Sequence, residues 1–296
     1  MANRQSLTAL NRILKLALGQ LSPKLGDVSA NLAKHLDWID QARARGAQLM
    51  VFPELSLTGY YLMDLVHDVA IEARAGDPVF DRLLAASADI DVVFGFIERD
   101  ARQRLYYASA YLSRGAVLHV HRKLYPVTYG MFDDGRFVGA GSSARAFDAP
   151  AGRAGIMICE DGWHMSVPYL LWQDGADLLL WTNASPGRGL GEPGRLSAAR
   201  VVENTACAYA SLLTTPVVFV NRVGYEDGNN FWGGSMVFDA DGDVVARAPD
   251  FEETLVYAEL DLNETRRARA RLPLLRDERR ELTLRELTRI VAERPA

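Results

Sequence analysis

The chain has 296 residues, of which 49% are hydrophobic and 24% charged, values that are ordinary for a globular protein with a large core. Its formal net charge of -5 argues against nucleic-acid binding, which usually requires a basic face. No segment approaches the roughly 20 apolar residues of a membrane span, and two cysteines make no disulfide framework. We therefore expect a cytoplasmic protein with neither a membrane nor a nucleic-acid partner.

Apolar periodicity alternates between strand and helix along the first half of the chain. Residues 14–21 alternate as in a strand, and residues 27–46 have helical spacing up to a terminating glycine. The apolar run 48–54 predicts a second strand, which ends in Glu54. The other elements expected in this half are a helix capped by Asp77 before Pro78, a strand over 91–97, and paired strands over 106–112 and 115–121.

The same alternation continues in the second half, without a Pro/Gly/Ser-rich linker. An apolar strand ends at Cys159, and the turn signal 239–242 separates two extended runs. We predict one α/β domain over residues 1–296, with 277–296 as a C-terminal tail helix. The remaining expected elements are helices over 167–174 and 197–212, strands over 176–182 and 217–221, and extended runs over 231–239 and 244–248.

Three of these strands end in residues that could together hydrolyse an amide. Amide cleavage needs a nucleophile, a proton shuttle and a charge that stabilises the oxyanion. Cys159 can attack the carbonyl carbon, Glu54 can carry the proton, and Lys123 can stabilise the negative charge. A carboxylate that is poised by desolvation makes a histidine unnecessary. The pattern therefore predicts a Glu-Lys-Cys triad that uses no metal and no cofactor.

The segments around these three residues contain known motifs. They are FPELSLTGY at 52–60, similar to FPE-x-x-x-x-GY, HRKL at 121–124, similar to RK-x-L, and GIMICED at 155–161, similar to G-x-x-I-C-x-D. On these motifs the chain is identified as a member of the nitrilase, or carbon-nitrogen hydrolase, superfamily. The resemblance implies an α/β fold, the four-layer α-β-β-α sandwich. It also implies the Glu54-Lys123-Cys159 triad and a homo-oligomer.

Further segments resemble the glutamine amidase domain of glutamine-dependent NAD synthetases. They are YPVTYGMFDDGRF at 125–137, CEDGW at 159–163 and NASP at 183–186. The resemblance implies that Tyr129, Glu160 and Ser185 lie around a bound glutamine. We add Tyr60 and Trp163, which belong to two of the quoted motifs, to the expected substrate-binding residues.

The chain departs from that group in two places. Phe132-Asp133-Asp134 stands where the group has FDE, and Asp134 is our candidate for the family's supporting second glutamate. The glycine-rich stretch 187–195 does not match the group's NASP-[FY]-x-x-GK run. The chain also contains no SGG-x-DS phosphate loop, so we expect a free-standing amidase without an ATP-binding synthetase domain.

We therefore expect an amidohydrolase that cleaves a linear, glutamine-like carboxamide to acid and ammonia. Two alternatives remain: an N-carbamoyl-amide or nitrile hydrolase, and an amidase-like subunit that docks onto a separate synthetase. Two imidazoles of one strand, those of His119 and His121, share a face but lack a third metal ligand at suitable spacing. His164 is expected to form part of the pocket wall.

Overall fold

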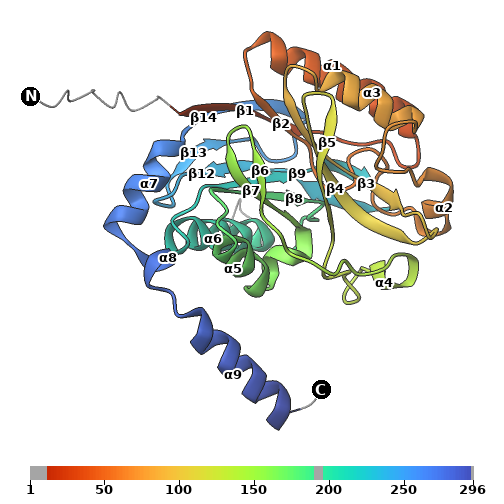
Figure 1. Cartoon of the computed structure of the whole chain (residues 1–296). Helices are drawn as coiled ribbons and strands as arrows, with labels where there is room; N and C mark the ends of the chain where they lie inside the picture. Colours follow the sequence, from red (N-terminus) through yellow and green to blue (C-terminus); the bar gives the residue numbers. More distant parts are fainter. Residues whose placement is uncertain (1–11, 190–195, 295–296) are drawn as a thin grey trace, which may run out of the picture.

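The computed structural model describes residues 12–189 and 196–294 (Figure 1). Within these residues the strands form two six-stranded sheets and one two-stranded ribbon. The order of the first sheet is β14 (Thr254–Asp261), β1 (Ile13–Gln20), β2 (Leu49–Val51), β3 (Asp91–Arg99), β4 (Leu105–Ser113) and β5 (Ala116–Arg122). The order of the second is β13 (Val244–Arg247), β12 (Met236–Phe238), β9 (Val217–Asn221), β8 (Leu178–Asn183), β7 (Gly152–Ile158) and β6 (Phe147–Ala149); the ribbon is β10 (Val223–Glu226) with β11 (Asn229–Trp232).

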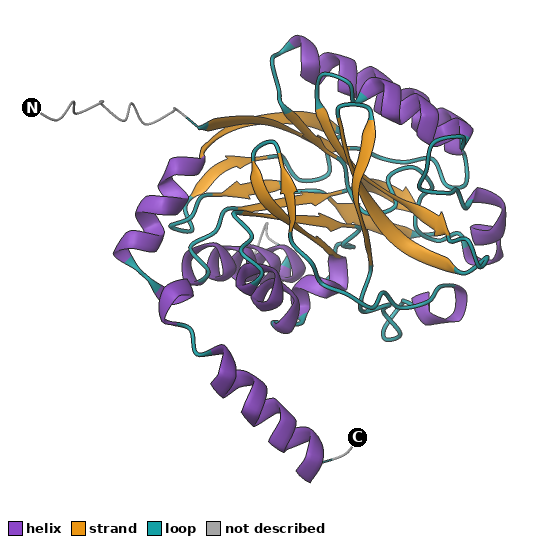
Figure 2. Ribbon diagram, viewed as in Figure 1, coloured by secondary structure: helices purple, strands orange, loops and turns teal. Residues whose placement is uncertain are grey.

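The two large sheets stack face to face, and helices cover their outer faces (Figure 2). Helices α1 (Val28–Ala44) and α3 (Pro78–Ala86) pack on the first sheet. Helices α5 (Ser166–Gln173) and α6 (Ser197–Leu212) pack on the second. The four-layer α-β-β-α sandwich that the family resemblance implies is therefore confirmed.

The alternation of side chains along each strand builds this layered core. In β8, Leu178 and Leu180 belong to the apolar cluster between the two sheets. Leu179 and Trp181 point the other way, into the cluster beneath α5 and α6. Successive side chains of a strand face opposite sides of a sheet, so strands buried on both faces read as continuous apolar runs. This explains why the central strands were visible in the sequence.

The helix signals in the sequence also correspond to observed contacts. Asp77 caps α3, because its Oδ1 accepts hydrogen bonds from the backbone N–H groups of Val79 at 2.9 Å and Phe80 at 3.2 Å. The other helical segments are η1 (Met63–Leu65), α2 (Val66–Val69), α4 (Asp134–Phe137), η2 (Cys159–Trp163), α7 (Leu262–Arg271), α8 (Leu274–Asp277) and α9 (Arg280–Glu293).

Two sequence predictions about strands were wrong in extent. The expected single run over 231–239 is broken by Gly233 and Gly234, whose φ angles are +74° and +59°, and the two halves join different sheets. The second strand was expected to reach Glu54 but ends at Val51. Pro53 cannot donate to a strand ladder, so the chain leaves the sheet as a loop that carries Glu54.

Of the tail helix expected over 277–296, the structure shows α9, Arg280–Glu293, which projects from the body of the molecule (Figure 1). No residue of α9 is buried. Residues 1–11 and 295–296 of the predicted domain, and 190–195 of the glycine-rich stretch, lie outside the described residues. Within the described ranges, we find no helix that is both long and apolar enough to cross a membrane.

Candidate active site

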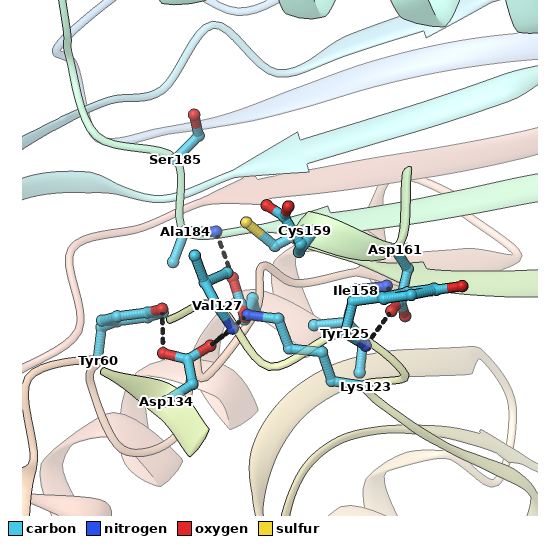
Figure 3. Close-up of polar contacts among 12 residues, drawn as sticks. Tyr60, Lys123, Tyr125, Val127, Asp134, Ile158, Cys159, Asp161, Ala184 and Ser185 are labelled. Carbon is cyan, nitrogen blue, oxygen red and sulfur yellow. Dashed lines mark hydrogen bonds and ion pairs between the residues drawn. The ribbon is translucent and has the colours of Figure 1, made fainter. Parts of the chain in front are cut away.

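Glu54, Lys123 and Cys159 come from three segments and meet between the two sheets. Glu54 lies in the loop after β2, Lys123 directly follows β5, and Cys159 directly follows β7. In Figure 3 the side chains of Lys123 and Cys159 extend into the same cluster, with the Lys123 ammonium drawn below the Cys159 thiol. Glu54 and Lys123 are 1% exposed and Cys159 is 7% exposed. The structure thus brings together the three residues that the sequence predicts to be catalytic.

Lys123 is held between two carboxylates. Its Nζ donates to Glu54 Oε1 at 2.8 Å and to Asp134 Oδ2 at 2.9 Å. Asp134 Oδ1 also accepts a hydrogen bond from the Tyr60 hydroxyl at 2.6 Å, as Figure 3 shows. The shorter side chain of Asp134 therefore still reaches the lysine, because α4 begins at Asp134 and places its carboxylate inside the cluster.

Glu54 is positioned by backbone contacts on both sides of its loop. Its Oε2 accepts a hydrogen bond from the Ala184 N–H at 2.8 Å. The loop packs directly on Gly95 of β3, where an added Cβ would lie 2.2 Å from the Leu55 nitrogen. Only a glycine permits this approach of two backbones. The carboxylate is consequently fixed, with one oxygen on Lys123 and the other on the backbone N–H of the residue that follows β8.

Cys159 occupies a sharp turn, at the point where β7 ends and η2 begins. Its φ of +46° lies in the left-handed region, which is unusual for a residue with a Cβ. The Trp181 indole supports the turn from below, because its Nε1 donates to the Cys159 carbonyl oxygen at 2.8 Å. Gly162 leaves the space for that indole, since a Cβ there would lie 2.2 Å from it. This geometry resembles the strained strand-to-helix turns that present nucleophiles.

Asp161 joins the turn of Cys159 to the segment of Lys123. Its Oδ2 accepts from the Ile158 N–H at 3.0 Å and lies 2.8 Å from His121 Nε2. Its Oδ1 accepts from the Leu124 N–H at 2.8 Å and from the Tyr125 N–H at 3.1 Å, of which Figure 3 shows the second. Asp161 is fully buried. One carboxylate therefore sets the distance between the residues next to the cysteine and the lysine.

Burial and neighbouring charges shift the acidities of the cluster. Burial and the nearby Glu54 carboxylate raise the pKa of the Cys159 thiol well above its usual value. Burial also raises the pKa of Glu54, against the opposing effect of Lys123. For Lys123, burial lowers the pKa, but the charges of Glu54 and Asp134 outweigh it and raise the pKa overall. Burial thus favours the neutral thiol of Cys159 and raises the proton affinity of the Glu54 carboxylate.

A cavity of about 350 Å³ opens above Cys159. Four of the five predicted substrate-binding residues line it: Tyr129, Glu160, Trp163 and Ser185. The Tyr129 hydroxyl donates to Glu160 Oε1 at 3.0 Å, and burial raises the pKa of this tyrosine. The other lining residues are Val127, Phe132, Pro186, Arg188, Gly189, Ser197, Ala198 and Val201.

Tyr60, the fifth predicted substrate-binding residue, lies behind the cluster. It lines a separate cavity of about 270 Å³, which does not include Cys159. Its ring centroid is 5.8 Å from Lys123 Nζ. Its backbone N–H donates to Glu226 Oε1 at 2.6 Å, and Glu226 in turn accepts from the buried Arg222. These contacts favour a role for Tyr60 in positioning Asp134 and Lys123.

The histidines lie beside the site. His164 stacks on Tyr125 with ring centroids 3.6 Å apart, and its Nε2 is 3.6 Å from Glu160 Oε1. It is not among the residues that line the cavity above Cys159, contrary to expectation. His119 stacks on Phe147 instead of pairing with His121. Among the residues that the structure describes, no group of three or more His, Cys, Asp or Glu side chains could hold a metal ion.

Sequence reasoning missed three parts of the site. The pattern gave no sign that Arg188 enters the cavity, because the stretch after NASP departs from the group's run. It also gave no sign that Glu226 supports Tyr60, because the two residues are 166 positions apart in the chain. Asp161 was visible within the GIMICED motif, but its contacts with Leu124 join segments 37 residues apart.

The chain belongs to the carbon-nitrogen hydrolase family, because the sequence model of that family matches residues 15–270. The two sheets, their covering helices and the polar cluster between them agree with that membership. The superfamily assignment made from the three motifs is thus confirmed.

Known proteins refine this placement. The glutamine-dependent NAD(+) synthetase of Acinetobacter baylyi is 32% identical over 252 residues, which cover 85% of this chain and 45% of that protein. A structure of glutamine-dependent NAD+ synthetase from Acinetobacter baumannii is 31% identical, with a TM-score of 0.76, over 86% of this chain and 46% of that chain. A carbon-nitrogen hydrolase from Helicobacter pylori, 20% identical, shares the fold with a TM-score of 0.83 over 93% of this chain and 98% of that one. The chain therefore spans about half the length of the synthetases it matches.

Proposed function

We propose that this protein hydrolyses a small linear carboxamide to an acid and ammonia through a cysteine acyl-enzyme. The observation that carries the proposal is the buried cluster in which Lys123 bridges Glu54 and Asp134 beside Cys159. Its members supply a nucleophile, a base and a fixed positive charge, which are the groups that amide hydrolysis requires.

The proposed reaction begins with proton transfer from the Cys159 thiol to Glu54. The thiolate attacks the amide carbonyl carbon, and the Lys123 ammonium stabilises the oxyanion of the tetrahedral intermediate. Glu54 returns the proton to the departing nitrogen, so ammonia leaves and a thioester remains on Cys159. Glu54 then takes a proton from water, whose oxygen attacks the thioester. The C–S bond breaks, the acid is released, and Glu54 returns the proton to the Cys159 sulfur. A carboxylate with a raised pKa suits this repeated proton transfer.

Glutamine-like amides are the substrates that we favour. The chain resembles glutamine-dependent NAD synthetases over 85% of its length. The cavity above Cys159, of about 350 Å³, is near the small end of the range for ligand sites, so it suits a short substrate. Glu160, held by the Tyr129 hydroxyl at 3.0 Å, provides a negative group for the ammonium of an amino-acid amide.

Ammonia release from glutamine and from simple amides tests the proposal. Wild-type protein should release ammonia, and Cys159→Ala should not. The mass of the intact protein after brief exposure to the amide should show an acyl adduct in the wild type alone. Equal release from both proteins would rule out Cys159 as the nucleophile.

Product analysis separates the alternatives within the same chemistry. A nitrile substrate would yield an acid or an amide, whereas an N-carbamoyl amide would also yield carbon dioxide. A synthetase partner would be found by co-purification from the native host, in complex with the protein.

We also propose that the protein is a homo-oligomer. Helix α9 exposes an apolar stripe, with Leu284, Leu287 and Val291 exposed by 69%, 56% and 69%. The stripe has the spacing of one helix face, and it borders an apolar groove against Met165 and Leu170 of the α5 region. A second copy could cover this face with the same face of its own.

A further inference from the structure

Arg188 introduces a positive charge into the cavity above Cys159. It lines this cavity together with Cys159 and Glu160. Its guanidinium carbon lies 4.6 Å from the ring centroid of Phe132, which also lines the cavity. Among the described residues, no carboxylate forms a salt bridge with Arg188. With an aromatic support and no acid partner among the described residues, this half-buried guanidinium is a ready site for an anion.

The backbone around Arg188 is held in place. The Gly187 N–H donates to the Asn230 carbonyl oxygen at 2.7 Å. The Arg188 carbonyl oxygen accepts from the Ala198 N–H at 3.1 Å, in the first turn of α6. The left-handed Gly130, at φ +66°, leaves room for the guanidinium, since a Cβ there would lie 3.3 Å from Arg188 Nη1. The arginine is therefore positioned by two elements and by a neighbouring glycine.

Among the described residues that line the cavity, one group carries each charge. Glu160 is negative and is held by Tyr129, whereas Arg188 is positive. A neutral aliphatic amide would leave the guanidinium without a partner. An amide whose far end carries a carboxylate would provide that partner, and guanidinium and carboxylate groups pair through two parallel hydrogen bonds.

We propose that Arg188 determines substrate specificity by binding the carboxylate of an amino-acid ω-amide whose carboxamide carbon is attacked by Cys159. This inference rests on the proposed amidase function and adds to it a residue in the stretch where the chain departs from the synthetase pattern. Glutamine and its shorter homologue asparagine belong to this substrate class.

A substrate pair that differs only in the carboxylate tests the role of Arg188. Glutamine carries the carboxylate, and 4-aminobutanamide is the same molecule without it. Arg188→Gln should lower kcat/KM for glutamine by about 10- to 100-fold, mainly through KM, as expected for one charge-assisted hydrogen-bonded pair. The value for 4-aminobutanamide should change by less than about threefold, and Arg188→Lys should restore part of the loss for glutamine. Arg200→Gln, an exposed arginine of α6, is the matched control.

Two kinetic outcomes would overturn the inference. An equal loss on both amides would mean that Arg188 only supports the loop. No loss on glutamine would mean that the guanidinium does not touch the substrate. If the wild type still releases ammonia, neither result contradicts the proposed amidase function.

A binding measurement separates this inference from the amidase proposal. Calorimetry with glutamine compares Cys159→Ala with the double variant Cys159→Ala/Arg188→Gln, so no turnover is needed. Weaker binding in the double variant, by the same factor as in kinetics, supports the inference even if the wild type releases no ammonia. Equal affinity in the two proteins, or no binding of glutamine to Cys159→Ala, overturns it.

Discussion

The Leu124 backbone N–H donates a hydrogen bond of 2.8 Å to Asp161 Oδ1. Leu124 is the residue after Lys123, and Asp161 lies two residues after Cys159. The second oxygen of Asp161 accepts from Ile158, the residue before the cysteine. Asp161 thereby fixes the segment that follows β5 and the segment around Cys159 relative to each other, although they belong to different sheets. The buried carboxylate acts on the proposed chemistry through position, since it touches neither the Cys159 sulfur nor the Lys123 nitrogen in any hydrogen bond of the structure.

Asp161→Asn should lower both stability and kcat. The asparagine amide has one accepting oxygen, whereas both oxygens of the Asp161 carboxylate accept hydrogen bonds, so at least one backbone N–H loses its partner. This should lower the free energy of unfolding by about 2–4 kcal/mol. We expect kcat to fall by about 10- to 100-fold, because small displacements of reacting groups are costly. Denaturant unfolding and ammonia release measure the two effects. Asp68→Asn, at an exposed position, is the control, and unchanged kcat in a folded Asp161→Asn would contradict the positioning role.

The activity of the wild type should fall at acid pH as Glu54 becomes protonated. Burial raises the pKa of Glu54, so the acid limb of kcat/KM should lie above the usual glutamate value of 4.5. Only the ionised form can take the thiol proton, so activity is present above this pKa and is lost as the pH falls through it. Glu54→Gln should lower kcat by about 10²- to 10⁴-fold and remove the acid limb.

The control for this prediction is Glu281→Gln, at an exposed position of α9, which should keep both the rate and the acid limb. An acid limb that persists unchanged in Glu54→Gln would assign it to another group.

His35 should make the fold less stable in acid. It is fully buried, with Nδ1 2.7 Å from the Asn31 carbonyl oxygen and Nε2 2.9 Å from Ser56 Oγ. Burial lowers the pKa of His35 to about 4, from 6.5. The unfolded chain therefore binds a proton between these pH values that the folded chain does not, and stability falls as the pH drops from 6.5 towards 4. The loss should be about 3 kcal/mol.

Denaturant titrations at a series of pH values test this effect. His35→Gln should be less stable at neutral pH but should show a shallower loss between pH 6.5 and 4. His67→Gln, which changes an exposed histidine, should keep the wild-type slope. Parallel slopes for the wild type and His35→Gln would contradict the prediction.

The apolar stripe of α9 should control assembly. Leu287→Glu places a charge in the centre of this exposed face and should convert the oligomer to smaller species. Arg285→Glu changes the charge of the same helix outside the stripe and should leave assembly intact. Light scattering gives the molar mass of each protein. A monomeric wild type, or an Arg285→Glu variant that dissociates as readily as Leu287→Glu, would exclude this face as the interface.

The fold and the residues of the proposed triad were largely accessible from the sequence. Strands such as β8 are buried on both faces, so they appear as uninterrupted apolar runs that need no tertiary information. Helix α3 was predictable from two local signals, the N-cap residue Asp77 and the proline that follows it. Glu54, Lys123 and Cys159 each stand at or just after the end of such a strand, within a short motif.

Residues whose partners are distant in the chain were decided only by the tertiary structure. Tyr60 was expected at the substrate, but its contact with Glu226, 166 residues away, places it behind Lys123. Arg188 enters the cavity because backbone bonds to Asn230 and Ala198 hold its loop there. Local patterns record which residues form a strand or a helix, because those interactions are local. Long-range packing decides which side chains meet between two stacked sheets. The sequence by itself therefore determined which reactive groups are available, and the tertiary structure decided how they are arranged.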